Sequence, residues 1–128
     1  MIVVDSSVWI AAFRSRRSRE ATVLSSLLDA DEVGLAVPVR AEILSGASTA
    51  DAGRLSRVLS ALPILYPTDE TWGLIERWIQ RAGKAGDHFG VGDLLIAGLC
   101  AEAGALLWSL DADFQRMGRL KFVGLYEP

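Results

Sequence analysis

Short apolar runs alternate along this chain with longer segments in which apolar residues recur every three or four positions. The runs are typical of buried strands, and the longer segments are typical of helices that bury one face. The expected strands cover residues 2–4, 33–37, 64–66, 106–108 and 122–125. The expected helices begin near residues 8, 21, 38, 51, 69, 91 and 112. This alternation predicts an α/β domain with a mostly parallel central sheet.

Capping residues and the distribution of apolar positions allow more detailed predictions for two of these helices. Thr68 is a suitable N-cap for the fifth helix, whose inward face is expected to carry Trp72, Ile75 and Ile79. Residues 91–103 are apolar on almost every side, so we expect this helix to be buried.

Composition limits the fold and the partners. The chain has 128 residues, of which 51% are hydrophobic and 23% charged, and this suits a single folded domain over residues 1–128. Its net charge of −3 excludes a protein that holds nucleic acid by overall basicity, so any such contact must be local.

Cellular location is indicated by what the chain lacks. Cys100 is the single cysteine and cannot form an internal disulfide, which suits a reducing compartment. No apolar stretch is long enough to span a bilayer, and the N-terminus does not resemble a signal peptide. We therefore expect a cytoplasmic protein without membrane contact.

Carboxylates are the unusual feature, because four of them lie inside apolar sequence. They are Asp5, Glu42, Asp93 and Asp111. An ionised carboxylate that is buried without a partner costs several kcal/mol, so such residues are rare unless they are paired or bind a metal. Asp5 and Asp111 each follow an expected strand. The carboxyl ends of parallel strands face the crevice where ligands bind, so these two acids can share it.

A shared crevice would have consequences for charge. If Glu42 and Asp93 also reach it, four like charges raise one another's pKa and destabilise the fold. A divalent cation removes this conflict, because Mg²⁺ and Mn²⁺ prefer carboxylate oxygens and water as ligands. Two ions would balance the four carboxylates, whereas one ion would leave net negative charge.

Each acid also has a simpler explanation when it is taken alone. Asp5 and Asp111 can be helix N-caps, and Glu42 can pair with Arg40. Asp93 fits such an explanation least, because Asp is a weak helix former and its neighbours are apolar. The four acids together are harder to explain in this way than any one of them.

Four segments resemble a known family in their order and spacing. They are Val-Val-Asp-Ser-Ser-Val-Trp-Ile at 3–10, Arg-Ala-Glu-Ile-Leu-Ser-Gly at 40–46, Gly-Asp-Leu-Leu-Ile-Ala-Gly at 92–98 and Leu-Trp-Ser-Leu-Asp-Ala-Asp-Phe at 107–114. Over nearly the whole chain, this set resembles the PIN-domain family, and within it the VapC toxins.

The resemblance implies a fold and a site. The fold would be a PIN-like, three-layer α/β/α domain with a mostly parallel central sheet. The acidic quartet that holds Mg²⁺ or Mn²⁺ would be Asp5, Glu42, Asp93 and Asp111. Supporting roles would fall to Ser7, Ser109 and Asp113. Two positions differ from the family pattern: Ser109 stands where Thr is commoner, and Leu110 where a polar residue is usual.

The resemblance also implies an activity and partners. A metal-activated water would cleave RNA phosphodiesters and leave 5′-phosphate and 3′-hydroxyl ends. The substrates of such toxins are structured RNAs such as tRNA or rRNA, and a cognate VapB-type antitoxin protein holds the toxin inactive. The apolar content of so small a chain also favours a homodimer.

A basic stretch stands out on this acidic chain. It consists of Arg14, Arg16, Arg17 and Arg19. The stretch can contact RNA phosphates, receive part of an acidic antitoxin tail, or form a solvated loop, and the sequence does not separate these roles. His88 is alone and is weak evidence for a metal site, and Gly90-x-Gly92 lacks the third glycine of a dinucleotide fingerprint.

Alternative functions remain at this point. A response-regulator receiver needs an acid beside Asp5 and a lysine after a late strand, but serines follow Asp5 and Lys121 precedes the last expected strand. A haloacid-dehalogenase-like phosphatase needs a second Asp where Ser7 stands. A PIN nuclease or RNA-binding module in RNA processing is also consistent with the sequence, although the presence of all four acids disfavours the binding module.

Overall fold

A four-stranded parallel sheet in the order β3-β2-β1-β4 forms the centre of the protein, whose computed structural model describes residues 1–128. The strands are β1 (Ile2–Val4), β2 (Val33–Ala36), β3 (Ile64–Leu65) and β4 (Leu106–Trp108). The helices are α1 (Ser6–Arg14), α2 (Arg19–Asp29), α3 (Val37–Gly46), α4 (Thr49–Ser60), α5 (Asp69–Lys84), α6 (Val91–Ala103) and α7 (Ala112–Arg119). All strand pairs are parallel, as predicted.

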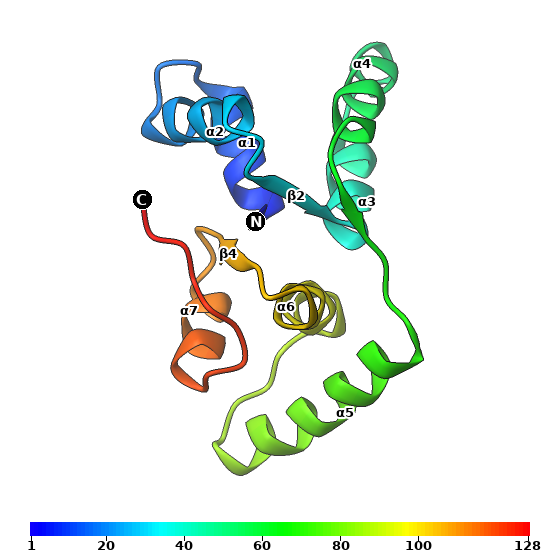
Figure 1. Cartoon of the computed structure of the whole chain (residues 1–128), viewed down its shortest axis with the longest axis vertical. Coiled ribbons are helices and arrows are strands. Elements are labelled where there is room, and N and C mark those ends of the chain that lie inside the picture. Colours follow the sequence, from blue (N-terminus) through cyan, green and yellow to red (C-terminus); the bar gives the residue numbers. More distant parts are fainter.

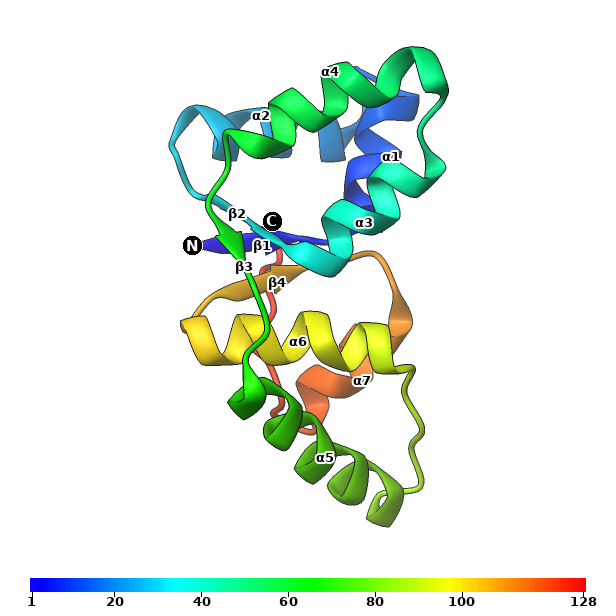
Figure 2. The same cartoon turned by 90° about the vertical axis from the view of Figure 1, so that its right-hand side faces the viewer.

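Helices cover both faces of this sheet. The first four, α1 to α4, lie on one side, and α5, α6 and α7 lie on the other (Figures 1 and 2). All residues of β1 and β2 are buried, which explains why these strands are continuous apolar runs without alternating polar positions. The predicted three-layer α/β/α arrangement is therefore confirmed. None of the helices combines the length and the apolar composition that crossing a membrane requires.

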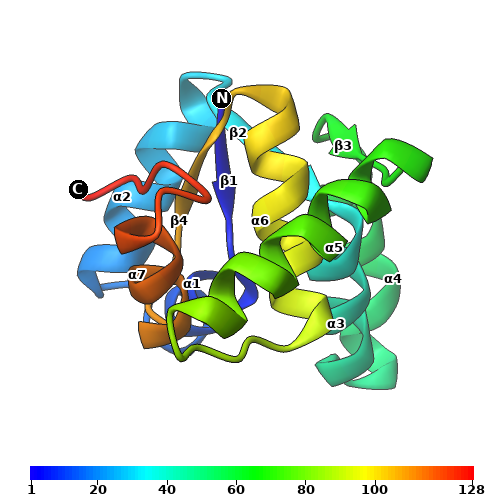
Figure 3. The ribbon, with the colours of Figure 1, turned by 90° about the horizontal axis from the view of Figure 1, so that it is seen from below.

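Several helices begin at the same edge of the sheet. The helix α1 follows β1 directly, and α3 follows β2 in the same way. The buried helix α6 runs in the opposite direction to the strands, so its first turn lies at the end of the molecule where β1 finishes (Figure 3). Side chains from three or more elements can therefore meet at the carboxyl edge of the sheet.

The inward face of α5 differs from the predicted one. Ile75 is buried as expected, but Trp72 and Ile79 are 44% and 48% exposed. The buried stripe consists of Thr71, Ile75, Trp78 and Ala82. Thr71 is fixed on this face, because its hydroxyl completes the capping box with Thr68 and donates a hydrogen bond to Glu102 of α6.

The predicted last strand, 122–125, is wrong as a strand. Leu125 forms one isolated parallel bridge with Leu107, and no ladder follows it. Lys121 adopts a positive φ of 64°, which turns the chain before this segment. The ring of Phe122 then stacks on Trp78 of α5, with their centroids 4.6 Å apart. The segment thus joins the sheet through this single bridge, with backbone hydrogen bonds from Leu107 to Gly124 and from Tyr126 to Leu107, and packs on α5 through Phe122.

Candidate metal centre

The register of β1 and β4 brings Asp5 next to Ser109. Val4 pairs with Trp108, so the following residues emerge side by side at the carboxyl edge. Asp5 is only 5% exposed, and its Oδ2 accepts hydrogen bonds from Ser7 Oγ at 2.7 Å and Ser109 Oγ at 2.8 Å. Asp5 occupies the N-cap position of α1 but makes no side-chain capping bond there. A simple capping role therefore does not account for this carboxylate.

The same two serines connect Asp5 to the start of α7. Ser7 Oγ accepts a hydrogen bond from the backbone N–H of Leu110 at 3.1 Å, and Ser109 Oγ accepts one from the N–H of Asp111 at 3.0 Å. Asp111 caps α7, since its Oδ1 accepts from the N–H of Asp113 at 2.9 Å. Capping thus explains one oxygen of Asp111, and the other is left without a hydrogen bond within the chain.

Glu42 reaches this edge from α3. Its Oε2 accepts a hydrogen bond from Ser6 Oγ at 3.0 Å. The alternative pairing with Arg40 is wrong, because Arg40 donates to Ser56 Oγ at 3.2 Å. Ser6 was not among the residues that the sequence pointed to, and only its place next to Asp5 could have suggested it.

The tightest acidic group combines α6 with α7. One oxygen each from Asp93, Asp111 and Asp113 can be chosen so that all three lie within 4.8 Å of one another. Asp93 lies in the first turn of α6, where the partial positive charge of the helix N-terminus favours an acid. Asp113, expected only as a supporting residue, is a full member of this group, whereas Asp5 and Glu42 lie outside it.

Shared electrostatics nevertheless connect all five acids. Burial has the largest effect on the pKa of Asp93, followed by the charges of Asp111, Asp5, Asp113 and Glu42 in that order, and together they raise it to about 6. Burial also raises the pKa of Glu42, with a smaller contribution from Asp5, while the hydrogen bond from Ser6 opposes the rise. These carboxylates therefore repel one another. Their oxygens are the ligands that Mg²⁺ and Mn²⁺ prefer, so the residues present fit a divalent cation.

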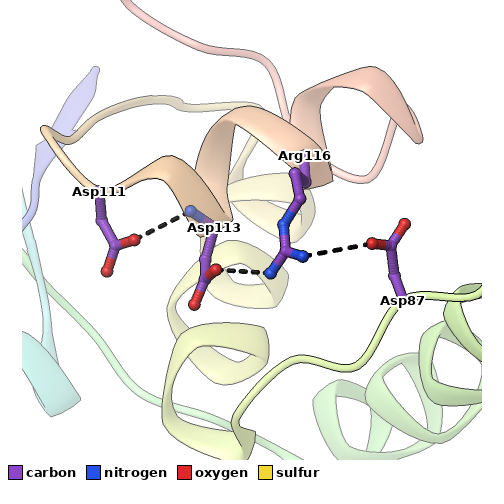
Figure 4. A network of polar contacts seen from close by, with 4 residues as sticks. All are labelled: Asp87, Asp111, Asp113 and Arg116. Carbon is purple, nitrogen blue, oxygen red and sulfur yellow. Dashed lines mark hydrogen bonds and ion pairs between the residues drawn. The ribbon is translucent and has the colours of Figure 1, made fainter.

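The guanidinium of Arg116, a residue to which the sequence did not point, lies beside this group. Arg116 Nη2 donates to Asp113 Oδ1 at 2.6 Å, and Arg116 Nη1 lies 3.4 Å from Asp87 Oδ1 (Figure 4). The spacing of Asp113 and Arg116, three residues apart on a short helix, was the only available signal. Asp87 lies in the segment between α5 and α6, and nothing in its sequence context indicated a role.

The basic stretch is divided between two places. Arg14 and Arg16 line a groove of about 680 Å³ between α1 and the α3–α4 pair, and Glu42 lines it too. Arg19 instead donates a hydrogen bond to the carbonyl of Pro128 and lines a second cavity beside Ser109. Arg17 is exposed and forms no ion pair. The structure therefore places Arg14 and Arg16 at one cavity and Arg19 at another.

Comparison with known proteins agrees with this arrangement. The sequence matches the family model of the PIN domain over residues 2–120. It is 34% identical over 125 residues to VapC ribonuclease Mb1587 of Mycobacterium bovis, covering 94% of this chain and 93% of that protein.

Solved structures show the same fold at lower identity. The structure of VapBC2 from Rickettsia felis, bound to a DNA fragment from the promoter, gives a TM-score of 0.78 at 18% identity over 98% of both chains. That of VapBC-5 from Mycobacterium tuberculosis, a member of the VapBC family of toxin–antitoxin systems, gives 0.66 at 20% identity over 98% of this chain and 97% of that one. The chain belongs to the PIN-domain family, and within that family to the VapC group.

Proposed function

We propose that this protein is a metal-dependent endoribonuclease that acts as the toxin of a toxin–antitoxin pair. The observation that carries the proposal is the meeting of five carboxylates at one edge of the sheet, with Asp93 held at a raised pKa by burial and by the other four. The name of the Mycobacterium bovis relative, a VapC ribonuclease, supports the same activity.

The proposed metal ligands are Asp5, Glu42, Asp93 and Asp111, with Asp113 as a further candidate. A bound Mg²⁺ or Mn²⁺ would supply a water of lowered pKa and would stabilise negative charge at the phosphodiester. Asp5 is held ready by Ser7 and Ser109, so its orientation does not depend on an ion. Asp93 lies in the first turn of α6 and Asp111 at the N-cap of α7, and the repulsion between them is relieved when a cation is shared.

Cleavage of RNA under defined metal conditions tests this function. Purified protein, free of antitoxin, is incubated with total bacterial RNA in Mg²⁺ or Mn²⁺, with and without EDTA, beside the Asp93→Asn variant. We expect a few discrete cuts in structured RNA such as tRNA or rRNA, with 5′-phosphate ends, that disappear in EDTA and in the variant. Cleavage that persists in EDTA contradicts the proposal, and RNA that stays intact with every metal favours an RNA-binding module.

The groove beside Glu42 is the proposed antitoxin site. Exposed apolar side chains line it, including Phe13 and Val58, together with Arg14 and Arg16. A partner segment with apolar and acidic residues would complement this lining, and its position next to Glu42 would couple binding to inhibition. We expect Phe13→Asp to prevent neutralisation by the antitoxin while RNA cleavage continues. An inhibited Phe13→Asp protein would rule out this groove.

A homodimer is proposed through the exposed face of α5. Trp72 and Ile79 lie seven residues apart, two helical turns, on the same side of that helix, and both are nearly half exposed. We expect the wild type to sediment as a dimer and Trp72→Glu to sediment as a monomer. A monomeric wild type at micromolar concentration would contradict the proposal.

A further inference from the structure

Arg116 of α7 is the one basic side chain that forms an ion pair with any of the five acids. Its guanidinium lies 2.6 Å from Asp113 Oδ1, and Asp113 Oδ2 makes no hydrogen bond within the chain. The ion pair therefore engages one oxygen of this carboxylate and leaves the other without a partner (Figure 4), and an oxygen of Asp113 lies within 4.8 Å of oxygens of Asp93 and Asp111.

A second set of contacts holds Arg116 itself. Its other nitrogen lies 3.4 Å from Asp87, whose side chain is 23% exposed. The guanidinium also lies over the ring of Phe89, 5.1 Å from its centroid, and Phe89 is buried against Phe122. Asp87 and Phe89 belong to the segment that leads into Gly90, the N-cap of α6, three residues before Asp93. Arg116 thus connects the helix that carries Asp113 with the segment that sets the start of α6.

Charge alone gives no reason for an arginine at this place. A positive side chain next to a cation site weakens cation binding by repulsion. An isolated surface pair between residues three apart contributes little to stability. A guanidinium that contacts two carboxylates and an aromatic ring has little freedom to move, however, and can therefore hold a carboxylate in one orientation.

We propose that Arg116 is a positioning residue, which orients Asp113 toward Asp93 and Asp111 and thereby strengthens divalent cation binding. The inference depends on the metal centre proposed above. It assigns Asp87 an indirect role, since Asp87 acts on the site through Arg116. Loss of a residue that orients a metal ligand weakens metal affinity about 10–100-fold.

Calorimetric titration with Mn²⁺, without RNA, tests the inference. We expect Arg116→Gln to raise the Kd for Mn²⁺ about tenfold. Asp87→Asn should raise it by a smaller factor, and the double variant should match Arg116→Gln alone, because Asp87 acts only through that arginine. Arg119→Gln, on the same helix and without an ion pair, is the control for the change in net charge and should leave the Kd unchanged.

The outcomes separate the two proposals. A wild type that does not bind Mn²⁺ overturns the metal centre and this inference with it. A wild type that binds, with an Arg116→Gln Kd that is equal or lower, overturns the inference alone, since removing a positive charge would by itself tighten binding. If Arg116→Gln does not fold, Arg116→Lys replaces it, because lysine keeps the charge but cannot bridge both carboxylates. A wild-type Kd in that variant overturns the inference.

Discussion

The two sides of the acidic site are organised in different ways. On the sheet side, Asp5 is buried and accepts hydrogen bonds from Ser7 and Ser109, two neutral donors. On the helix side, one oxygen each of Asp93, Asp111 and Asp113 lie within 4.8 Å of one another, and burial together with repulsion raises the pKa of Asp93 to about 6. Asp5 on the sheet side therefore has hydrogen-bond donors within the chain, whereas Asp93 on the helix side has none, although Asp113 beside it pairs with Arg116.

The two sides show two different ways in which carboxylates can be held in place before a metal ion binds. Neutral hydroxyl donors fix a carboxylate without cancelling the charge that attracts the ion. Crowded carboxylates supply that charge, but they destabilise the folded chain until the ion binds. Substitutions on the two sides should therefore have the same effect on catalysis and opposite effects on the stability of the metal-free protein.

The largest expected effect is the loss of RNA cleavage in Asp5→Asn and in Asp93→Asn. Each removes a proposed ligand, and we expect cleavage in Mg²⁺ to fall below detection in both. In EDTA at pH 7.5 their stabilities should diverge. Asp5→Asn should lose about 1–3 kcal/mol, because a charge-assisted hydrogen-bond pair is weakened in a buried place. Asp93→Asn should gain stability, because repulsion is removed.

Urea denaturation followed by circular dichroism measures these stabilities. Asp29→Asn is the matched control, since Asp29 is exposed at the end of α2 and makes no side-chain hydrogen bond. It should change neither cleavage nor stability by more than about 0.5 kcal/mol. If Asp5→Asn and Asp93→Asn shift the unfolding midpoint in the same direction, the proposed difference between the two sides of the site is wrong.

Ser109→Ala should have the next largest effect. Its hydroxyl donates to Asp5 and accepts from the N–H of Asp111, so its loss loosens acids on two elements. We expect cleavage to fall about 10–100-fold, as is usual when a partner of a metal ligand is removed. Rates in single-turnover assays over a range of Mn²⁺ concentrations measure this. Ser109→Thr keeps the hydroxyl and should recover most of the rate, and a failure to do so would indicate a packing effect.

The stability of the metal-free protein should depend on pH through Asp93. Folding raises its pKa from 3.8 to about 6, so the folded chain binds more protons than the unfolded chain between these values. The free energy of unfolding therefore falls as pH rises through this window, by about 1–2 kcal/mol once solvent screening of a half-buried group is allowed for. The difference between wild type and Asp93→Asn in EDTA, measured at pH 5 and at pH 7.5, isolates this contribution. A difference that does not change with pH would contradict it.

Much of the fold could be predicted from the sequence, because its elements have strong periodic patterns. The predicted bounds of the helix at 91–103 match α6, and the strand at 106–108 matches β4. The helix α5 and the burial of Ile75 were predicted correctly, but Trp72 and Ile79 are apolar and yet face away from the core, while the polar Thr71 is buried and donates a hydrogen bond to another helix. Such a contact between distant residues leaves no periodic signal.

For the site as well, the sequence indicated the residues but not their arrangement in space. Asp5, Glu42, Asp93 and Asp111 could be found because acids in apolar sequence are costly without a reason. The division of these acids between two sides of the site could not be predicted, since it depends on the pairing of Val4 with Trp108 and on where α7 begins. Arg116 and Asp87 were missed because each is an ordinary charged residue in a polar context, and only the fold brings them together.

The smallest predicted effect concerns Ser6, which holds Glu42 at the border between the two sides. Its hydrogen bond lowers the pKa of Glu42 against the rise caused by burial, so Ser6→Ala should raise that pKa further. Stability should change by less than about 1 kcal/mol, because both side chains lie at the surface. The acid limb of the pH–rate profile for RNA cleavage should move to higher pH, with the rate at pH 8 nearly unchanged. Ser45→Ala, exposed on α3 without a side-chain hydrogen bond, is the control. If both variants give the wild-type profile, the ionisation of Glu42 does not limit cleavage, and the charge that matters lies with Asp5 and the helix-side acids.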